Sequence, residues 1–379
     1  MDYLSSFSLI DLAQMMTAGF AVLLALPMML SRDSGQARLF LAVFLLIQGG
    51  FALWSVITWS PVLAIVTREL LSPFEHVPST VLQGLQGPIL LWFSCSVSGS
   101  PVRPTLFDKT IIAAFVLLPA PIAWLASSYG IWSYIVCGGF ALLISIVYGV
   151  QALRQVHDHN REIRQRYSNI EARQLLWLGY LAFGFIGVWS MRLSAGIVGV
   201  FNEELAMMIG GLSIYPVAIL ICWMAVLGMS WGVRATSGEG TKALGHASDG
   251  ATTNFNPEMI EKLEDLMSRV KLYQDADLHL DGLADSMGIS ARSLSALING
   301  HYQRNFYEFV NDYRVRDARR QLVDPRLKPK TIQRIFEDAG FSSKSTFNTY
   351  FRKVTGKTPS EYRKAAYSDF DAYLGGPTR

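Results

Sequence analysis

Long apolar runs in the first 231 residues most restrict how this chain can fold. A helix that crosses the hydrocarbon core of a bilayer needs about 20 predominantly apolar residues. Seven segments fit that length, although residues 67–78, just before the third, are too polar to span. We therefore predict an all-α chain in which residues 1–234 form a seven-helix transmembrane domain. The predicted spans are residues 9–30, 39–59, 80–97, 110–127, 132–153, 175–200 and 207–231.

Basic residues in the loops predict how these spans are oriented, because short cytoplasmic loops are enriched in Lys and Arg. The loops after the first, third and fifth spans hold most of the basic residues, whereas the only basic residue in the alternate loops is Arg68. An N-terminus outside and a C-terminal part in the cytoplasm follow, in the inner membrane of a bacterium. The first run lacks a basic leader and a cleavage site, so it is interpreted as a retained span. The basic loop residues are Arg32, Arg38, Arg103, Lys109, Arg154, Arg161, Arg164, Arg166 and Arg173.

One ionisable residue inside a predicted span is the main candidate for signal recognition. Charged groups in hydrocarbon are costly and often functional, which draws attention to Arg192 in the sixth span. Glu75 and His76, in the outer loop between the second and third spans, are candidates for completing an outward-facing polar pocket for an unknown ligand, together with Gln83 and Gln86 at the start of the third span. The alternative is that Arg192 extends to the outer interface, where its guanidinium meets water.

No pattern for catalysis, a metal or a cofactor is found in the sequence. The cluster of His157, Asp158 and His159 lacks further ligands, and the three cysteines lie in apolar runs, where small buried thiols are expected. There is no phosphate-binding glycine loop, zinc motif or nucleophile elbow. We therefore expect a protein that is not an enzyme, with no cofactor, metal or catalytic residue.

The composition changes after the last apolar run. Residues 235–255 are mainly Ser, Gly, Thr, Ala and Asn, which predicts a flexible linker. Asn256, Pro257 and Glu258 then have the pattern of a helix N-cap, a first-turn proline and an acidic first turn. A second domain is therefore expected over residues 256–379.

This second domain contains an imperfect repeat. Residues 283–290 and 335–342 each combine a short helical segment, a glycine turn and a serine N-cap, and each precedes a second helical segment. Two helices joined by a short turn with glycine form the helix-turn-helix pattern, whose second helix enters the major groove of DNA. A predicted helix over residues 306–323 separates the copies and is ~27 Å long, against ~34 Å for one turn of DNA. Two recognition helices can thus address successive major grooves.

The charge of this region supports a nucleic-acid partner. Residues 290–364 hold 16 Lys and Arg against 7 Asp and Glu, a balance of +9, whereas the whole chain carries only +3. Such a bias is typical of a surface that faces phosphates, and the alternative is a solvated basic face.

Three motifs resemble the DNA-binding domain of AraC/XylS-type transcriptional regulators. They are LADSMGIS at 283–290 with LSALIN at 294–299, NFYEFVNDYR at 305–314, and AGFSSKSTFNTYFRKVTGKTPSEYR at 339–363. The resemblance covers about 100 residues and implies binding to double-stranded promoter DNA through two helix-turn-helix units. It further implies activation of transcription with RNA polymerase, and frequently a homodimer. The soluble N-terminal barrel usual in that family is absent here, so its inducer cannot be carried over.

The resemblance also implies roles for individual residues. By position, Arg292 and Lys344 would read guanine and Asn348 would read adenine. Two departures from the family pattern are Phe336, where a small residue is usual, and Gln303, where glycine is common. Altered helix spacing in the second unit is therefore expected. The candidates for base contacts are Arg292, Ser295, Ala296, Lys344, Ser345, Asn348 and Thr349, and those for backbone contacts are Asn299, Arg314, Arg316, Arg352 and Lys353.

Together, these features predict a one-component regulator in which a membrane or extracytoplasmic signal controls a DNA-binding module. A membrane transporter or enzyme with an autoregulatory DNA-binding module is the alternative, and a receptor controlled by partner proteins in the lipid bilayer is a third. Because about 20 flexible residues transmit orientation poorly, a signal carried by dimerisation or local concentration is expected rather than a rigid lever.

Overall fold

The computed structural model divides the chain into two compact units. One contains residues 1–158 and 175–245, and the other contains residues 159–174 and 246–379. Apart from an isolated bridge between Tyr167 and His279, the regular structure of the described residues is helical, so the all-α prediction is confirmed. The described residues are 8–30, 35–60, 63, 69–72, 74–125, 131–170, 174–213, 215–217, 219–220, 223 and 257–373. The predicted linker, residues 235–255, lies outside them.

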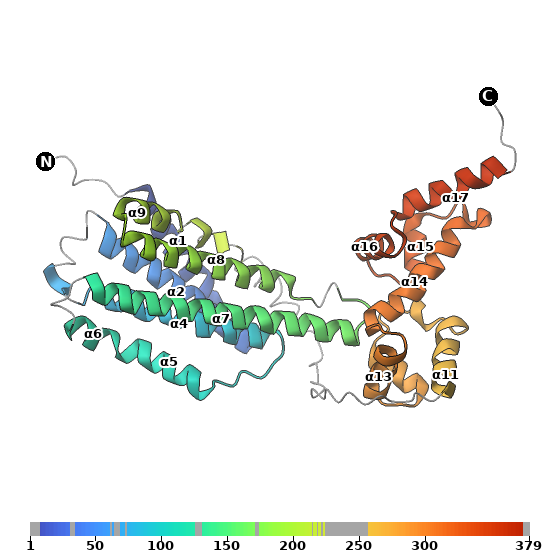
Figure 1. The fold of residues 1–379 in the computed structure, drawn as a ribbon, viewed down its shortest axis with the longest axis horizontal. Helices are drawn as coiled ribbons and strands as arrows, with labels where there is room; N and C mark the ends of the chain where they lie inside the picture. Colours follow the sequence, from blue (N-terminus) through green and yellow to red (C-terminus); the bar gives the residue numbers. More distant parts are fainter. Residues whose placement is uncertain are drawn as a thin grey trace, which may run out of the picture. The chain divides into compact units, whose positions relative to one another are not determined.

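The N-terminal unit is a helical bundle (Figure 1) in which α2 packs against both α1 and α4, and α8 packs against α9. Pairs of polar side chains join neighbouring helices: Gln14 donates to Ser55 at 3.2 Å, and Gln48 donates to Gln86 at 3.0 Å. The helices are α1 (Leu9–Leu30), α2 (Gln36–Trp59), α4 (Val77–Val97), α5 (Leu106–Leu117), α6 (Pro119–Leu125), α7 (Ile131–Arg166), α8 (Leu176–Gly199) and α9 (Glu203–Leu212).

Four helices among the described residues are long and apolar enough to cross a membrane. They correspond to the first, second, fifth and sixth predicted spans, so the prediction of seven is only partly supported. The helix α4 has sufficient length, but Gln83 and Gln86 lower its mean hydropathy. The four segments are Leu9–Leu30, Gln36–Thr58, Gly138–Arg166 and Leu176–Gly199.

The fourth and seventh predicted spans do not appear as single long helices in the described residues. The fourth is interrupted because α5 ends at Leu117 and α6 begins at Pro119, whose ring nitrogen has no proton to donate to the preceding turn. The seventh, residues 207–231, begins within α9 and otherwise falls largely on residues outside the description.

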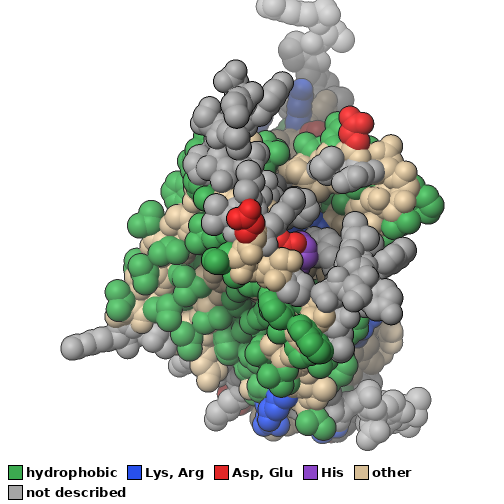
Figure 2. All heavy atoms as spheres, turned by 90° about the vertical axis from the view of Figure 1, so that its left-hand side faces the viewer, with side chains coloured by type: hydrophobic (Ala, Val, Ile, Leu, Met, Phe, Trp, Pro, Cys, Tyr) green, Lys and Arg blue, Asp and Glu red, His purple; other side chains and the backbone are tan. Residues whose placement is uncertain are grey.

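The surface of this unit carries many exposed hydrophobic side chains. Leu23 is 67% exposed on α1 and Phe183 is 70% exposed on α8. Figure 2 shows hydrophobic side chains spread over much of the face turned to the viewer, with few charged groups among them. An apolar surface of this extent is unusual for a protein surrounded by water.

The other unit contains the helices that follow the predicted linker. Two separate hydrophobic cores form in it, one around α11 to α13 and one around α15 to α17, and α14 contributes to both. The predicted helix over residues 306–323 is observed with the same bounds. The elements are α11 (Pro257–Ser268), η2 (Leu272–Gln274), α12 (Leu280–Met287), α13 (Ala291–His301), α14 (Phe306–Val323), η3 (Pro325–Leu327), α15 (Ile332–Asp338), α16 (Lys344–Thr355) and α17 (Pro359–Tyr373).

Side-chain caps set the start of several of these helices. Asn305 accepts a hydrogen bond from the backbone N–H of Glu308 at 2.9 Å at the start of α14. Thr358 and Glu361 form a reciprocal capping box before α17, since each backbone N–H donates to the other side chain. The helix α11 begins at Pro257 as expected, whereas its predicted cap Asn256 lies outside the described residues.

Gln303 takes the backbone conformation of the glycine that is common at its position. Its φ angle is +54°, in the left-handed region, and its side-chain amide donates to the carbonyl of Gly300 at 2.7 Å. The left-handed region is costly for a residue with a Cβ atom.

We predict that Gln303→Gly raises the free energy of unfolding of this unit by about 0.5 to 1 kcal/mol, because the relief of strain exceeds the entropic cost of glycine. Pulse proteolysis of the detergent-solubilised chain in urea measures the change. As a control, Gln303→Ala removes the amide but keeps the strain, so it should give no gain. Equal stabilities of the glycine and alanine variants would contradict the argument.

Candidate nucleic-acid interface

The first helix-turn-helix unit consists of α12 and α13. The helix α12 ends at Gly288, whose φ of +70° lets the chain reverse, and a backbone bond from Ile289 to Ala284 closes the turn. Ser290 then starts α13 by accepting a hydrogen bond from the N–H of Ser293 at 3.1 Å. The glycine turn and serine cap recognised in the sequence thus have these structural roles.

The second unit, α15 and α16, repeats this construction. Its turn contains Gly340 with a φ of +91°, and Ser343 caps α16 by accepting from the N–H of Thr346 at 3.2 Å. The cap is therefore one residue later than the predicted Ser342. Both copies of the sequence repeat nonetheless fold as a helix, a tight turn and a second capped helix.

The second helix of each unit has a buried face and an exposed face. Inward-facing side chains are Leu294, Leu297 and Ile298 on α13, and Phe347, Tyr350 and Phe351 on α16. The predicted base-contacting residues lie mainly on the opposite faces. Exposed among them are Arg292, Ala296, Lys344, Ser345 and Thr349, and half-buried are Ser295 and Asn348.

Four of the five predicted backbone contacts are accessible. Asn299, Arg316 and Arg352 are exposed, and the guanidinium of Arg316 lies 5.0 Å from the ring centre of Tyr313. Lys353 forms an ion pair with Glu308 at 3.1 Å, although its side chain stays 60% exposed.

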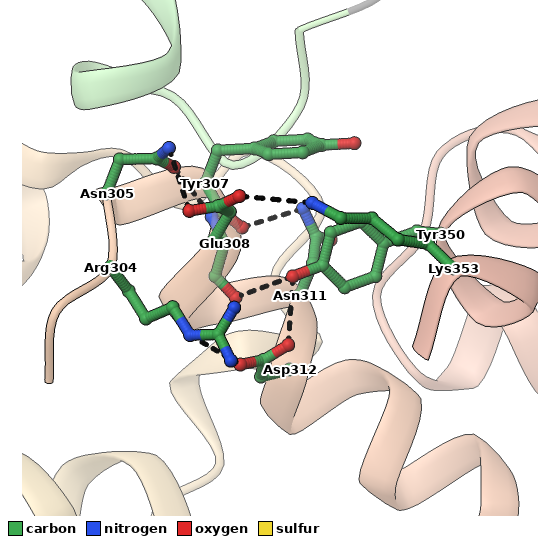
Figure 3. A network of polar contacts seen from close by, with 8 residues as sticks. All are labelled: Arg304, Asn305, Tyr307, Glu308, Asn311, Asp312, Tyr350 and Lys353. Carbon is green, nitrogen blue, oxygen red and sulfur yellow. Dashed lines mark hydrogen bonds and ion pairs between the residues drawn. The ribbon is translucent and has the colours of Figure 1, made fainter. Parts of the chain in front are cut away.

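A polar network fixes the second recognition helix to α14 (Figure 3). The hydroxyl of Tyr350 donates to the Asp312 carboxylate at 2.8 Å and also lies 3.1 Å from the Glu308 carbonyl. Arg304 pairs with the other oxygen of Asp312 at 3.6 Å. Burial and the Asp312 carboxylate raise the pKa of the Tyr350 hydroxyl, so it stays protonated and able to donate.

Arg314 corrects one sequence prediction, because it is 1% exposed and cannot reach a DNA phosphate in this conformation. Its Nε donates to the carbonyl of Tyr273 and its Nη2 to the carbonyl of Asp275, both at 2.7 Å. Burial lowers the pKa of the guanidinium to about 10, which leaves it charged at neutral pH. Helical spacing already indicated this burial, since Arg314 lies one turn after the buried Val310 on the same face.

The loop held by Arg314 also contacts the second unit. A Cβ atom built on Gly340 would lie 2.3 Å from the carbonyl oxygen of Tyr273 and 2.9 Å from the Cα of Gln274. The turn of the second unit therefore packs directly on η2. Sequence reasoning identified Gly340 as a turn residue but not as the point where the two halves of the domain meet.

Phe336, the other departure from the family pattern, is buried in the second unit. It is 6% exposed and stacks on Phe347, with ring centres 5.7 Å apart. The larger side chain thus belongs to the aromatic core beneath the second recognition helix.

Two of the three predicted signal-site residues, Arg192 and Glu75, contact residues of α2. The guanidinium of Arg192 lies 5.0 Å from the ring centre of Phe51 and 5.5 Å from that of Trp189. The indole of Trp54, three residues after Phe51, donates to the carbonyl of Glu75 at 2.9 Å. The side chains of the neighbouring Glu75 and His76 also meet, with Oε1 of Glu75 3.3 Å from Nε2 of His76. In the described residues, no cluster of three metal-ligating side chains is found.

Comparison with known proteins decides the class of the C-terminal part. A family model described as a helix-turn-helix domain matches residues 283–365, which include both units. These residues form an AraC-type helix-turn-helix domain. The sequence resemblance of this domain is thereby confirmed.

Similar curated proteins are also regulators, and all align over a minor part of the chain. A transcriptional regulator, GlxA of Rhizobium meliloti, is 28% identical over 124 residues, 33% of this chain and 36% of its own. The transcriptional activator RhaS of Pectobacterium atrosepticum is 29% identical over 92 residues, 24% of this chain and 32% of its own. An uncharacterized regulator of Staphylococcus aureus is 29% identical over 103 residues, 27% of this chain and 13% of its own.

The chain thus spans about a third or less of these relatives' lengths. No solved structure shows significant similarity to the chain.

Two glycines of the AraC-type domain provide a matched test of the packing at η2. Gly340→Ala is expected to cost about 3 kcal/mol, because it adds both left-handed strain and a clash with the backbone of Tyr273. Gly288→Ala should cost only about 1 kcal/mol, since its added Cβ meets no atom within 4 Å. Pulse proteolysis of the full chain in urea compares them, and equal losses would contradict the assigned contact.

Proposed function

We propose that the chain is a membrane-anchored, one-component transcription regulator that binds promoter DNA through α13 and α16. The observation that carries the proposal is the pair of capped helices whose exposed faces present Arg292 and Lys344. Arginine and lysine at such positions donate to the O6 and N7 acceptors of guanine in the major groove. Arg316 and Arg352 would neutralise phosphates beside these base contacts.

The N-terminal unit supports attachment to a membrane. It supplies four helices of sufficient length and apolarity, and its exposed surface is rich in side chains such as Leu23 and Phe183. Exposure of this kind is favourable when the surrounding solvent is lipid. The bacterial inner membrane is the compartment in which such an anchor would leave the AraC-type domain beside DNA.

Contacts near residue 168 support a cytoplasmic position for the end of α7. Ser168 is hydrogen bonded to the carbonyl of Leu278, so these two residues lie on the same side of the bilayer. An even number of crossings must therefore separate them. Because α8 provides one, the predicted seventh span over residues 207–231 would provide the second.

We place signal reception in the N-terminal unit, with Arg192, Glu75 and His76 as the candidate site. Support comes from α2, where Phe51 contacts Arg192 and Trp54 contacts Glu75 within about one helical turn, ~4.5 Å along the axis. The proposed outcome is that the chain, as a homodimer, activates transcription together with RNA polymerase. That it activates rather than represses is supported by the relative RhaS, which is named a transcriptional activator.

Genome-wide chromatin immunoprecipitation of the full-length chain tests DNA recognition. Sharp peaks at a few promoters are expected, and they should disappear in Arg292→Ala combined with Lys344→Ala, because each bidentate contact contributes about 1–3 kcal/mol of discrimination. The control is Arg269→Ala combined with Arg326→Ala, which removes the same charge from exposed positions outside the recognition helices. Peaks absent in every condition would instead favour a transporter or enzyme with a vestigial DNA module.

The salt dependence of binding separates phosphate contacts from base contacts. Arg316→Ala should weaken binding to cognate and unrelated DNA alike and reduce the slope of log K against log salt by about 1. Arg292→Ala should weaken mainly cognate binding. Fluorescence anisotropy with the chain in nanodiscs measures both, and a cognate-only effect of Arg316→Ala would contradict its assignment.

A further inference from the structure

The compact unit that holds the AraC-type domain includes a short segment from a distant part of the sequence. Residues 159–174 belong to it, whereas the sequence placed them within the membrane domain. The segment begins as the last two turns of α7, which runs without interruption from Ile131 to Arg166. It therefore continues directly from a helix that is a candidate membrane span.

Ser168 is the centre of the contact between this segment and the domain. It is 1% exposed, and its hydroxyl donates to the carbonyl of Leu278 at 2.6 Å and accepts from Nη2 of Arg314 at 3.0 Å. Its backbone N–H donates to the same Leu278 carbonyl at 3.3 Å. The backbone carbonyl of Ser168 accepts from Asn311 at 3.3 Å and from Arg314 at 3.4 Å. Every polar group of this serine thus has a partner within the domain.

The neighbours of Ser168 extend the contact. Tyr167 forms an antiparallel bridge with His279, and Ile170 is 6% exposed. Both partners on the domain side, Leu278 and His279, directly precede α12, the first helix of the first helix-turn-helix unit. A displacement of the segment would therefore act on the start of that unit.

We propose that residues 166–170, here called the docking segment, are the intramolecular contact through which the membrane part controls the AraC-type domain. The inference rests on the proposed function and gives the signal a route other than the predicted linker. A signal that shifts α7 would move the docking segment and, through Leu278 and Arg314, the first recognition unit.

The geometry indicates that the docking segment positions the domain and does not block it. Its partners in the domain include Leu278, His279, Asn311 and Arg314, and none of these four is a candidate base contact. With the segment in place, Arg292 and Lys344 remain exposed. Loss of docking is therefore expected to remove the signal response while leaving the affinity for DNA nearly unchanged.

Disulfide cross-linking tests the contact independently of any function. The native cysteines are first replaced by serine, and Tyr167→Cys is combined with His279→Cys in the full chain in membranes. Opposed residues of an antiparallel pair have Cα atoms about 4.5–5.5 Å apart, within the range of a disulfide. Oxidation should give an intramolecular cross-link, whereas Tyr167→Cys with Arg326→Cys should give none. A missing 167–279 cross-link, or equal yields from both pairs, would overturn the proposal even if DNA binding is established.

A bulky substitution tests the regulatory role. Ser168→Trp overfills a closed site and should lower the cross-linking yield about tenfold, and Ser360→Trp, at an exposed serine, is the control. With a reporter at an immunoprecipitated promoter, we expect Ser168→Trp to abolish the variation of output across growth conditions while operator affinity stays within about twofold. The proposal would be overturned if Ser168→Trp prevents the 167–279 cross-link but reporter output still varies with growth conditions as in the unchanged chain.

The reversible disulfide between positions 167 and 279 provides a second test that does not depend on the folding of Ser168→Trp. The 167–279 pair keeps the native docking geometry, so the oxidised chain in nanodiscs should bind operator DNA with the affinity of the reduced chain. Binding that is lost on oxidation and restored by reductant would overturn the positioning role, because it would show that the docked state blocks DNA.

Discussion

The arrangement of the AraC-type domain depends on the hydrogen bonds of one buried guanidinium, that of Arg314. It lies inside the domain at 1% exposure and donates to backbone carbonyls of Tyr273 and Asp275. A buried cation is stable only if its donors are satisfied, so the surrounding backbone must adopt one geometry. That geometry presents the carbonyl of Tyr273 to the turn at Gly340, where a glycine is required. The relation between the two helix-turn-helix units thus follows from one side chain on α14.

The same guanidinium also contacts the segment that follows α7. Ser168, two residues after the end of α7, completes the hydrogen bonding around Arg314 and Asn311 and becomes part of the domain interior. A linker with the composition of residues 235–255 would by itself transmit only proximity. The docking segment offers a second mechanism for passing on a signal, because it forms a short path from a candidate span to the first helix-turn-helix unit.

Sequence reasoning located much of the candidate DNA-binding surface because local rules determine it. Gly288 with Ser290, and Gly340 with Ser343 one position farther on, specify a turn and a cap regardless of what packs around them. The periodicity of α14 was sufficient to give its bounds. Local rules were less reliable in the apolar N-terminal unit, where Pro119 divides a predicted span and polar residues make α4 less apolar than the four candidate spans. Arg314 was assigned to phosphates on its charge, although its place on the buried face of α14 indicated otherwise.

By itself, the sequence determined the helical class, the apolar N-terminal half, the two helix-turn-helix units and the residues on their exposed faces. These properties follow from hydrophobic periodicity, caps and turns, which act between residues a few positions apart. Only the tertiary structure decided that Gly340 meets Tyr273 and that Ser168 lies against Leu278 and Asn311. Contacts between residues this far apart in the sequence depend on how whole elements pack, and no local pattern in the chain encodes them.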